Sequence, residues 1–128
     1  MRTTLLLLVL TLAPFASLAA AELTRDDLTG FWVLDTTSVS KDQKDAAAAA
    51  QTIEGFGMVL TARIGRVTFE ADSMIAGMWR VEDATATTAT VIIQSKGGSE
   101  HSYQMTLTKK GQLQVAEIPG GLLLMRAP

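Results

Sequence analysis

Cysteine is absent from this chain of 128 residues. Disulfides, thiolate catalysis, cysteine-ligated metals and a lipid anchor on an N-terminal cysteine are therefore excluded. Histidine occurs once, at His101, so any histidine general base would have to be this residue. A strong charge of one sign is also missing, because 11 Lys and Arg face 13 Asp and Glu for a net charge of −2. Nucleic acid and anionic membranes, which select basic patches, are not expected partners.

A hydrophobic run long enough to span a bilayer is lacking as well. The apolar run from Leu5 to Leu12 is much shorter than the roughly 20 residues that a membrane-spanning helix needs. Arg2 precedes this run and the small residues Ala19-Ala20-Ala21 follow it, which is the pattern of a secretory signal peptide. We therefore predict a signal peptide at residues 1–21, one domain at residues 22–128, no membrane span, and a periplasmic or secreted location.

Helical signals stand on both sides of the first predicted strand. Thr24 is a suitable N-cap for a helical turn, and Gly30 to Asp35 follows as a strand. Ser40 and Gln43 then form a capping-box pattern, which predicts a helix from Lys41 to about Leu60.

Three apolar side chains of this predicted helix share one face. Ile53, Phe56 and Leu60 recur at spacings of three and four residues, so we expect this face to pack on the sheet. Gly55 and Gly57 each disfavour a helix by roughly 1 kcal/mol and indicate an end or a bend near them.

From Arg66 onward the hydrophobic period changes to two, and Gly, Asp and Ser mark the turns. Six further strands are predicted, at Val67 to Ala71, Met74 to Glu82, Thr88 to Ser95, His101 to Thr108, Gln112 to Glu117 and Leu122 to Arg126. The predicted fold is mainly β, of the α+β class. It is an antiparallel meander of about seven strands, curved into a small barrel or half-barrel, with one helix after the first strand. Bulky residues at inward positions predict a filled interior.

The two ends of this meander carry a recognisable pattern. Gly30-Phe31-Trp32 opens the first strand after a short helical turn, and Arg126 lies in the last strand. This arrangement resembles the lipocalin-like (calycin) family of small β-barrels. The resemblance implies that Trp32 lies at the closed end of a barrel with Arg126 stacked on its ring, where a guanidinium over an indole gains cation–π energy.

Candidate binding residues lie on the apolar faces of the predicted elements. His101 and Tyr103 share the apolar face of one strand, and Phe56 lies on the apolar face of the predicted helix. We take these three residues as candidates for contact with a ligand or partner. No catalytic residue is assigned, because the sequence has no nucleophile elbow, zincin motif or phosphate loop.

The methionines and one pair of carboxylates are two further candidate sites, for a metal and for hydrolysis. Methionines suit soft metals, but Met74 and Met78 lie about 13 Å apart if they share a strand, too far for one ion. We therefore predict no metal and no cofactor. Glu70 and Asp72 lie two residues apart near a turn, where paired carboxylates would suit hydrolysis and a solvated hairpin end is the simpler interpretation.

The leading functional hypothesis is an exported, non-enzymatic binding module. It would recognise a protein partner, as an inhibitor or in an envelope interaction, or a small apolar ligand. The alternative is a minimal hydrolase-type enzyme that uses His101 or the Glu70 and Asp72 carboxylates. A second alternative is a structural envelope protein. The sequence does not determine the oligomeric state.

Overall fold

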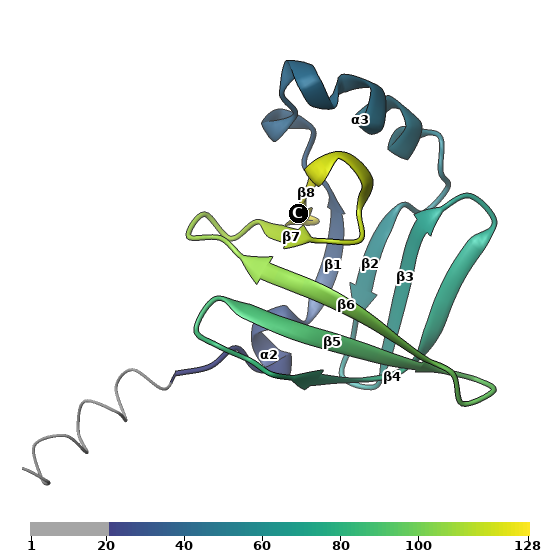
Figure 1. The fold of residues 1–128 in the computed structure, drawn as a ribbon, viewed down its shortest axis with the longest axis vertical. Coiled ribbons are helices and arrows are strands. Elements are labelled where there is room, and N and C mark those ends of the chain that lie inside the picture. The colour runs from purple at the N-terminus through teal and green to yellow at the C-terminus, as the bar shows by residue number, and fades with distance from the viewer. Residues whose placement is uncertain (1–20) are drawn as a thin grey trace, which may run out of the picture.

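The computed structural model describes residues 21–128, so the predicted signal peptide lies outside the described residues apart from Ala21. Eight antiparallel strands follow one another around a closed barrel, and the last strand pairs with the first (Figure 1). They are β1 (Gly30–Leu34), β2 (Gly57–Leu60), β3 (Ile64–Glu70), β4 (Ser73–Glu82), β5 (Thr88–Ser95), β6 (Glu100–Leu107), β7 (Leu113–Val115) and β8 (Leu123–Arg126). The mainly β meander is confirmed. It has eight strands rather than about seven, and it closes completely.

The strand that the sequence prediction missed is β2. The predicted helix from Lys41 to Leu60 is wrong beyond Gln51, because residues 57–60 pair with β1 and β3. Met58 and Leu60 both point into the barrel, so this segment has the period of a strand. Gly57 makes the pairing possible, since it adopts a φ of 131° and a Cβ there would lie 2.2 Å from the Trp32 carbonyl oxygen.

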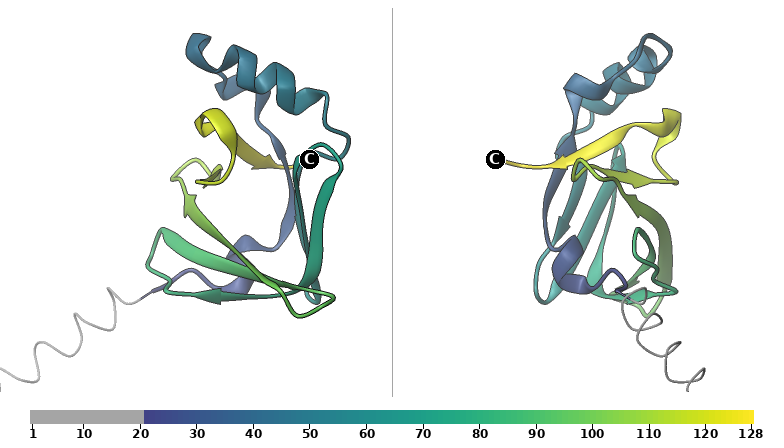
Figure 2. Two further views of the ribbon diagram at one scale, coloured as in Figure 1. Left: turned by 45° about the vertical axis from the view of Figure 1, so that its right-hand side comes forward. Right: turned by 90° about the vertical axis from the view of Figure 1, so that its left-hand side faces the viewer.

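The helical part of this segment is short and lies at one end of the barrel. A 3₁₀ turn, η2 (Lys41–Gln43), leads into α3 (Lys44–Gln51), and the Ser40 N–H donates to Gln43 as expected for the start of a helix. The Gln43 side chain donates to the carbonyls of Gly120 and Gly121 at 3.0 and 3.1 Å. Both glycines lie in the 3₁₀ turn η3 (Pro119–Gly121), just before β8. Figure 2 shows α3 beyond the strand ends, with the short helix α2 (Arg25–Leu28) at the other end.

At the α2 end, Trp32 and Arg126 close the barrel together. Trp32 is 1% exposed and its indole N–H donates to the Leu28 carbonyl at 2.8 Å. The Arg126 guanidinium carbon lies 4.5 Å from the Trp32 ring centroid, and the same side chain donates to the Asp27 carbonyl. The expected contact between these two residues is therefore present. It joins α2, the first strand and the last strand in one cluster.

Truncation of Arg126 measures the strength of this closure. We expect Arg126→Ala to lower the free energy of unfolding by about 0.5 to 2 kcal/mol, because it removes a cation–π contact and a hydrogen bond to α2. Lys110→Ala is the control, since Lys110 is exposed in a hairpin turn and should change stability by about 0.5 kcal/mol or less. Urea unfolding followed by circular dichroism measures both. Equal unfolding midpoints for the two variants would contradict the role of Arg126 in closure.

A second tryptophan at the same end, Trp79, also stacks under an arginine and donates its indole N–H to a backbone carbonyl. No pattern in the sequence predicts this contact. The Arg25 guanidinium carbon lies 4.4 Å from the Trp79 ring centroid, and the Trp79 indole N–H donates to the Thr61 carbonyl at 2.8 Å. Arg25 also donates to the Ala62 carbonyl in the β2–β3 turn at 2.7 Å. The α2 end is therefore held by two arginines, each stacked on an indole.

The barrel interior is filled by apolar side chains, as the bulky inward positions predict. The most buried include Leu28, Leu60, Val91, Ile93, Leu113, Val115 and Leu124, each with no measurable exposure. Asp35 is the one buried polar residue among those described, and it accepts hydrogen bonds from Thr37 and from the Gln112 side chain. These hydrogen bonds, that of the Thr37 hydroxyl first, lower the pKa of the Asp35 carboxyl. Within residues 21–128, no helix is long and apolar enough to cross a membrane.

Candidate functional site

A basin of about 410 Å³ opens at the end of β3 opposite the turn that α2 holds. Its floor is apolar and consists of Val67 and Phe69 of β3, which are buried, and Ile75 of β4, which is half-buried. The polar and rim residues are Glu70, Ser73, His101, Tyr103, Glu117 and Pro119. Residues of three strands, β3, β4 and β6, meet here with the segment after β7, so the basin is a concave end of the core.

A row of three aromatic rings runs from the basin towards α3. Phe69 lies between the other two, with ring centroids 5.9 Å from Tyr103 and 5.8 Å from Phe56. Its contact with Tyr103 is edge-to-face at 82°, a favourable arrangement for aromatic pairs. Phe69 and Pro119 also line a smaller apolar slot of about 80 Å³ beneath α3. The alanines of α3, together with Ile53, Phe56 and Leu122, complete the slot.

The charge in the basin is acidic. Glu70 and Glu117 contribute two carboxylates, and no Lys or Arg is among the residues that line the cavity. The Glu117 Oε1 accepts a hydrogen bond from the Gln104 backbone N–H at 3.0 Å, which holds this carboxylate next to β6. Burial raises the pKa of the Tyr103 phenol, and the negative charges of Glu117 and Glu70 raise it further. Tyr103 is therefore a protonated hydroxyl in an electronegative cavity.

The structure places the candidate residues in two groups. His101 and Tyr103 line the basin together, and Phe56 lines the neighbouring slot and reaches Tyr103 only through Phe69. Phe56 lies in the turn before β2 and is half-buried. The motif residues Gly30, Trp32 and Arg126 lie at the closed end, away from the basin.

Six basin residues were not anticipated from the sequence as part of a site: Val67, Phe69, Ser73, Ile75, Glu117 and Pro119. Glu117 lies in the turn after β7, where the alternation of Leu113 and Val115 no longer applies, so no strand pattern places it in the basin. Ser73 and Phe69 required the knowledge that the β3–β4 hairpin lies against β6 and the end of β7. That is a property of the closed barrel, which no local pattern encodes.

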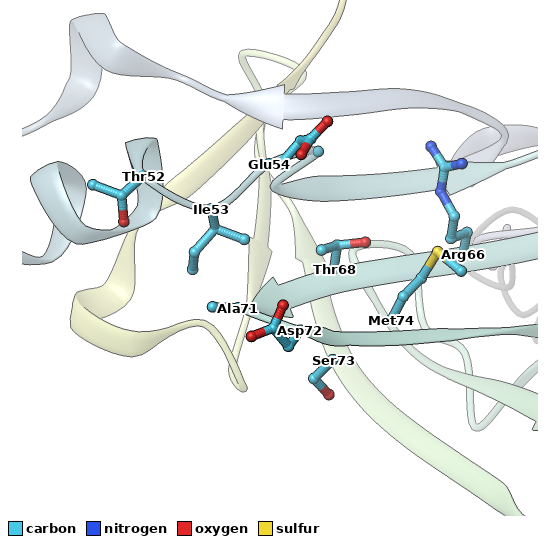
Figure 3. A pocket seen from close by; sticks show the side chains of 10 residues that line it. Thr52, Ile53, Glu54, Arg66, Thr68, Ala71, Asp72, Ser73 and Met74 are labelled. Carbon is cyan, nitrogen blue, oxygen red and sulfur yellow. The ribbon is translucent and has the colours of Figure 1, made fainter.

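Glu70 and Asp72 do not share a cavity. Glu70 lines the basin, whereas Asp72 lines a groove of about 560 Å³ on the outside of the barrel. Figure 3 shows this outer groove, with Asp72 and Glu54 towards α3 and Arg66 beside Met74 at the far side. Asp72 has a φ of 61°, and this turn directs the two side chains to different surfaces. The structure therefore does not bring together the carboxylate pair considered for hydrolysis.

A catalytic relay is also not assembled at the basin. Ser73, His101 and Glu117 line it together, but within residues 21–128 no side-chain hydrogen bond joins His101 to either of the others. In the same part of the chain, no three His, Cys, Asp or Glu side chains form a metal-binding group. The methionines are also divided, since Met58 and Met105 are buried in the barrel while Met74 and Met78 point outward.

Four large apolar side chains are exposed on the outer surface of the first four strands. Phe31 is 59% exposed, Ile64 54%, Met74 60% and Met78 69%. The register places Phe31 beside Val59, and Ile64 beside Met78. These side chains lie on the outward side of the barrel wall, with the exposed Arg66 of β3 among them, and we call this surface the outer face. Large exposed apolar areas on a protein surface are typical of interaction sites.

Comparison with protein-family models, with curated proteins and with solved structures finds no match to this chain.

Proposed function

We propose that this protein is an exported, non-enzymatic binding module that holds a small ligand with an apolar body in the basin at the barrel mouth. The observation that carries the proposal is the basin itself, with its apolar floor, its aromatic row and the slot that adjoins it. Its volume of about 410 Å³ falls in the range of about 300 to 1,000 Å³ typical of ligand pockets. Export rests on the pattern of residues 1–21, and a periplasmic or secreted location follows from it.

We also propose a lipocalin-like relationship for this protein, and the closed barrel supports it. Gly30, Trp32 and Arg126 have the arrangement that the resemblance implies, with the arginine over the indole at the closed end. The candidate ligand site lies at the opposite end. An enzyme is the weaker interpretation, because Glu70 and Asp72 line different cavities and His101 lacks a hydrogen-bonded nucleophile among the described residues.

A fluorescence titration with N-phenyl-1-naphthylamine, a neutral apolar probe, tests this proposal. We expect the probe to brighten on binding to the wild type and to Met74→Trp, and to lose about tenfold or more in affinity for Ser73→Trp. Ser73 lines the basin and lies two residues before Ile75 in β4, so both side chains point to the same side of the strand. An indole at residue 73 would therefore fill the mouth of the basin. Met74 is its neighbour on the outward side and is 60% exposed, which makes it the matched control.

Two outcomes of this titration would contradict the proposed ligand site. If the wild type does not bind the probe, or if Ser73→Trp binds it as tightly as Met74→Trp does, the basin is not the ligand site. Native mass spectrometry of the protein purified from its own source adds an independent measurement, because a retained ligand appears as added mass that Ser73→Trp should lack.

A protein partner is the second candidate function, and the outer face favours it. Its exposed methionines supply a direct probe, because exposed thioethers oxidise faster than buried ones. In the purified protein we expect peroxide to oxidise Met74 and Met78 well before Met58 and Met105, which are buried. Protection of Met74 and Met78 in the unfractionated source material would support a partner on the outer face. Equal oxidation in both preparations would count against it.

A further inference from the structure

The polar groups of the basin select for a particular kind of ligand. Two carboxylates reach it from different elements, Glu70 from the end of β3 and Glu117 from the segment after β7. Neither has an ion pair with Lys or Arg among residues 21–128, where Arg80 with Glu82 and Glu100 forms the only ion-pair cluster. Uncompensated charge in a cleft with apolar walls attracts ligands of the opposite sign and repels those of the same sign.

Tyr103 adds an independent observation. The residue is 8% exposed, and its hydroxyl has no hydrogen-bond partner among the described residues. A hydroxyl that no protein group satisfies is free to form its hydrogen bonds with water or with a ligand. No fully enclosed side-chain polar atom in residues 21–128 lacks a partner, which means that the Tyr103 hydroxyl remains accessible from the basin.

The two carboxylates differ in how firmly they are held. Glu117 is fixed by the hydrogen bond from the Gln104 N–H to one of its oxygens, which leaves the other oxygen available. Glu70 is exposed at the hairpin, and its side chain accepts no hydrogen bond from the described residues. Both carboxylates line the same cavity as Tyr103, and after burial their negative charges also raise the pKa of its phenol. The acidic groups, Tyr103 and the apolar floor therefore belong to one cavity.

We infer that the ligand is a cationic amphiphile, with a protonated amine at Glu70, Glu117 and the Tyr103 hydroxyl and with its apolar body over Val67, Phe69 and Ile75. This inference rests on the proposed function, since it names the ligand class for the same basin. The ammonium group donates hydrogen bonds to the carboxylates and to the phenolic oxygen. The floor buries the hydrocarbon, and each methylene that leaves water adds to the affinity.

Competition among ligands with the same apolar body tests the inference. Decylamine, decanol and decanoate, each below its micelle concentration, are titrated at neutral pH against the N-phenyl-1-naphthylamine complex. We expect decylamine to displace the probe at about fivefold to tenfold lower concentration than decanol, and decanoate to be the weakest. Butylamine should fail, because its apolar body is short. The preference should shrink when salt rises from about 0.01 M to about 1 M, because the screening length falls from about 30 Å to about 3 Å.

Matched variants assign the preference to the carboxylates. Glu70→Gln and Glu117→Gln should each reduce the ratio of decylamine to decanol affinity several-fold, with little change for decanol, because they remove a charge and keep the shape. Glu117→Gln retains a side-chain oxygen that can accept from Gln104. Asp72→Asn is the control, since it removes a carboxylate from the same hairpin but from the outer groove. Tyr103→Phe should weaken decylamine binding and leave the probe bound.

The possible failures are distinguishable. If the probe binds in the basin and the three decyl compounds displace it equally, the inference is overturned and the proposed function stands. The same holds if Asp72→Asn changes the ratio as much as Glu70→Gln and Glu117→Gln do. If the probe does not bind the wild type at all, the proposed function fails and the inference fails with it.

Discussion

Replacing Trp32 with alanine should cost about 3 to 5 kcal/mol of unfolding free energy, the range for truncating a large buried aromatic side chain. Trp32 is 1% exposed, stacks under Arg126 and donates to the Leu28 carbonyl, so its removal leaves a cavity and an unpaired carbonyl at the closed end. The total free energy of unfolding of a native protein is only about 5 to 15 kcal/mol. We therefore expect Trp32→Ala to be largely unfolded at moderate temperature.

Phe31→Ala is the matched control for Trp32→Ala. Phe31 precedes Trp32 in the same strand but points outward and is 59% exposed, so its loss should cost about 1 kcal/mol or less. Urea unfolding followed by far-ultraviolet circular dichroism avoids the change in fluorescence that the loss of a tryptophan brings. If both variants had the same midpoint, Trp32 would not be part of the core in the way described above.

A single methyl group at residue 77 should be nearly as damaging. A Cβ on Gly77 would lie 1.8 Å from the Gln94 carbonyl oxygen and 2.7 Å from its carbonyl carbon, so β4 and β5 would have to separate. These are backbone atoms in a paired strand and cannot rotate away. We expect Gly77→Ala to lower the free energy of unfolding by about 3 kcal/mol or more, at or above the upper end of the range for overpacked cores.

Gly97→Ala separates the steric effect from the effect of replacing any glycine. Neither Gly77 nor Gly97 has a positive φ, and a Cβ on Gly97 would have no atom within 4 Å. Gly97→Ala should therefore be neutral, or stabilising by up to about 1 kcal/mol through the unfolded chain. Thermal and urea unfolding of the two variants measure the difference. Similar stabilities would show that β4 and β5 do not approach each other so closely at Gly77.

The strands from β3 onward could be predicted because their side chains alternate and their turns are marked. Ala71 to Ser73, for example, separates two runs of period two, and the structure has a tight turn there. β2 could not be predicted in the same way. It is only four residues long, and Ile53, Phe56 and Leu60 imitate the spacing of a helix. What makes Gly57 to Leu60 a strand is contact with β1, and that contact becomes visible only in the folded barrel.

Only those residues of the candidate site that follow the inward and outward alternation of side chains along a strand could be predicted. His101 and Tyr103 could be placed on the inward face from the sequence. Glu117 could not be placed by the same rule, because it lies in the turn after β7. The position of Phe69 between Phe56 and Tyr103 depends on how α3 and β6 lie around the end of β3. The stacking of Arg25 on Trp79 likewise depends on docking of α2 against the β2–β3 turn. Neither contact has a signature in the sequence.

Pairing of the last strand with the first has a consequence for the order of folding. Arg126 and Asp27 contact each other although 99 positions separate them, whereas the other strand pairs join neighbours in the chain. Closing so long a loop has a large entropic cost and is slow. Until β8 is in place, β1 and β7 each have an unpaired edge that could pair with another chain. The period of greatest risk of aggregation therefore lasts until the C-terminal strand has docked, and a chain that loses β8 would keep both edges open.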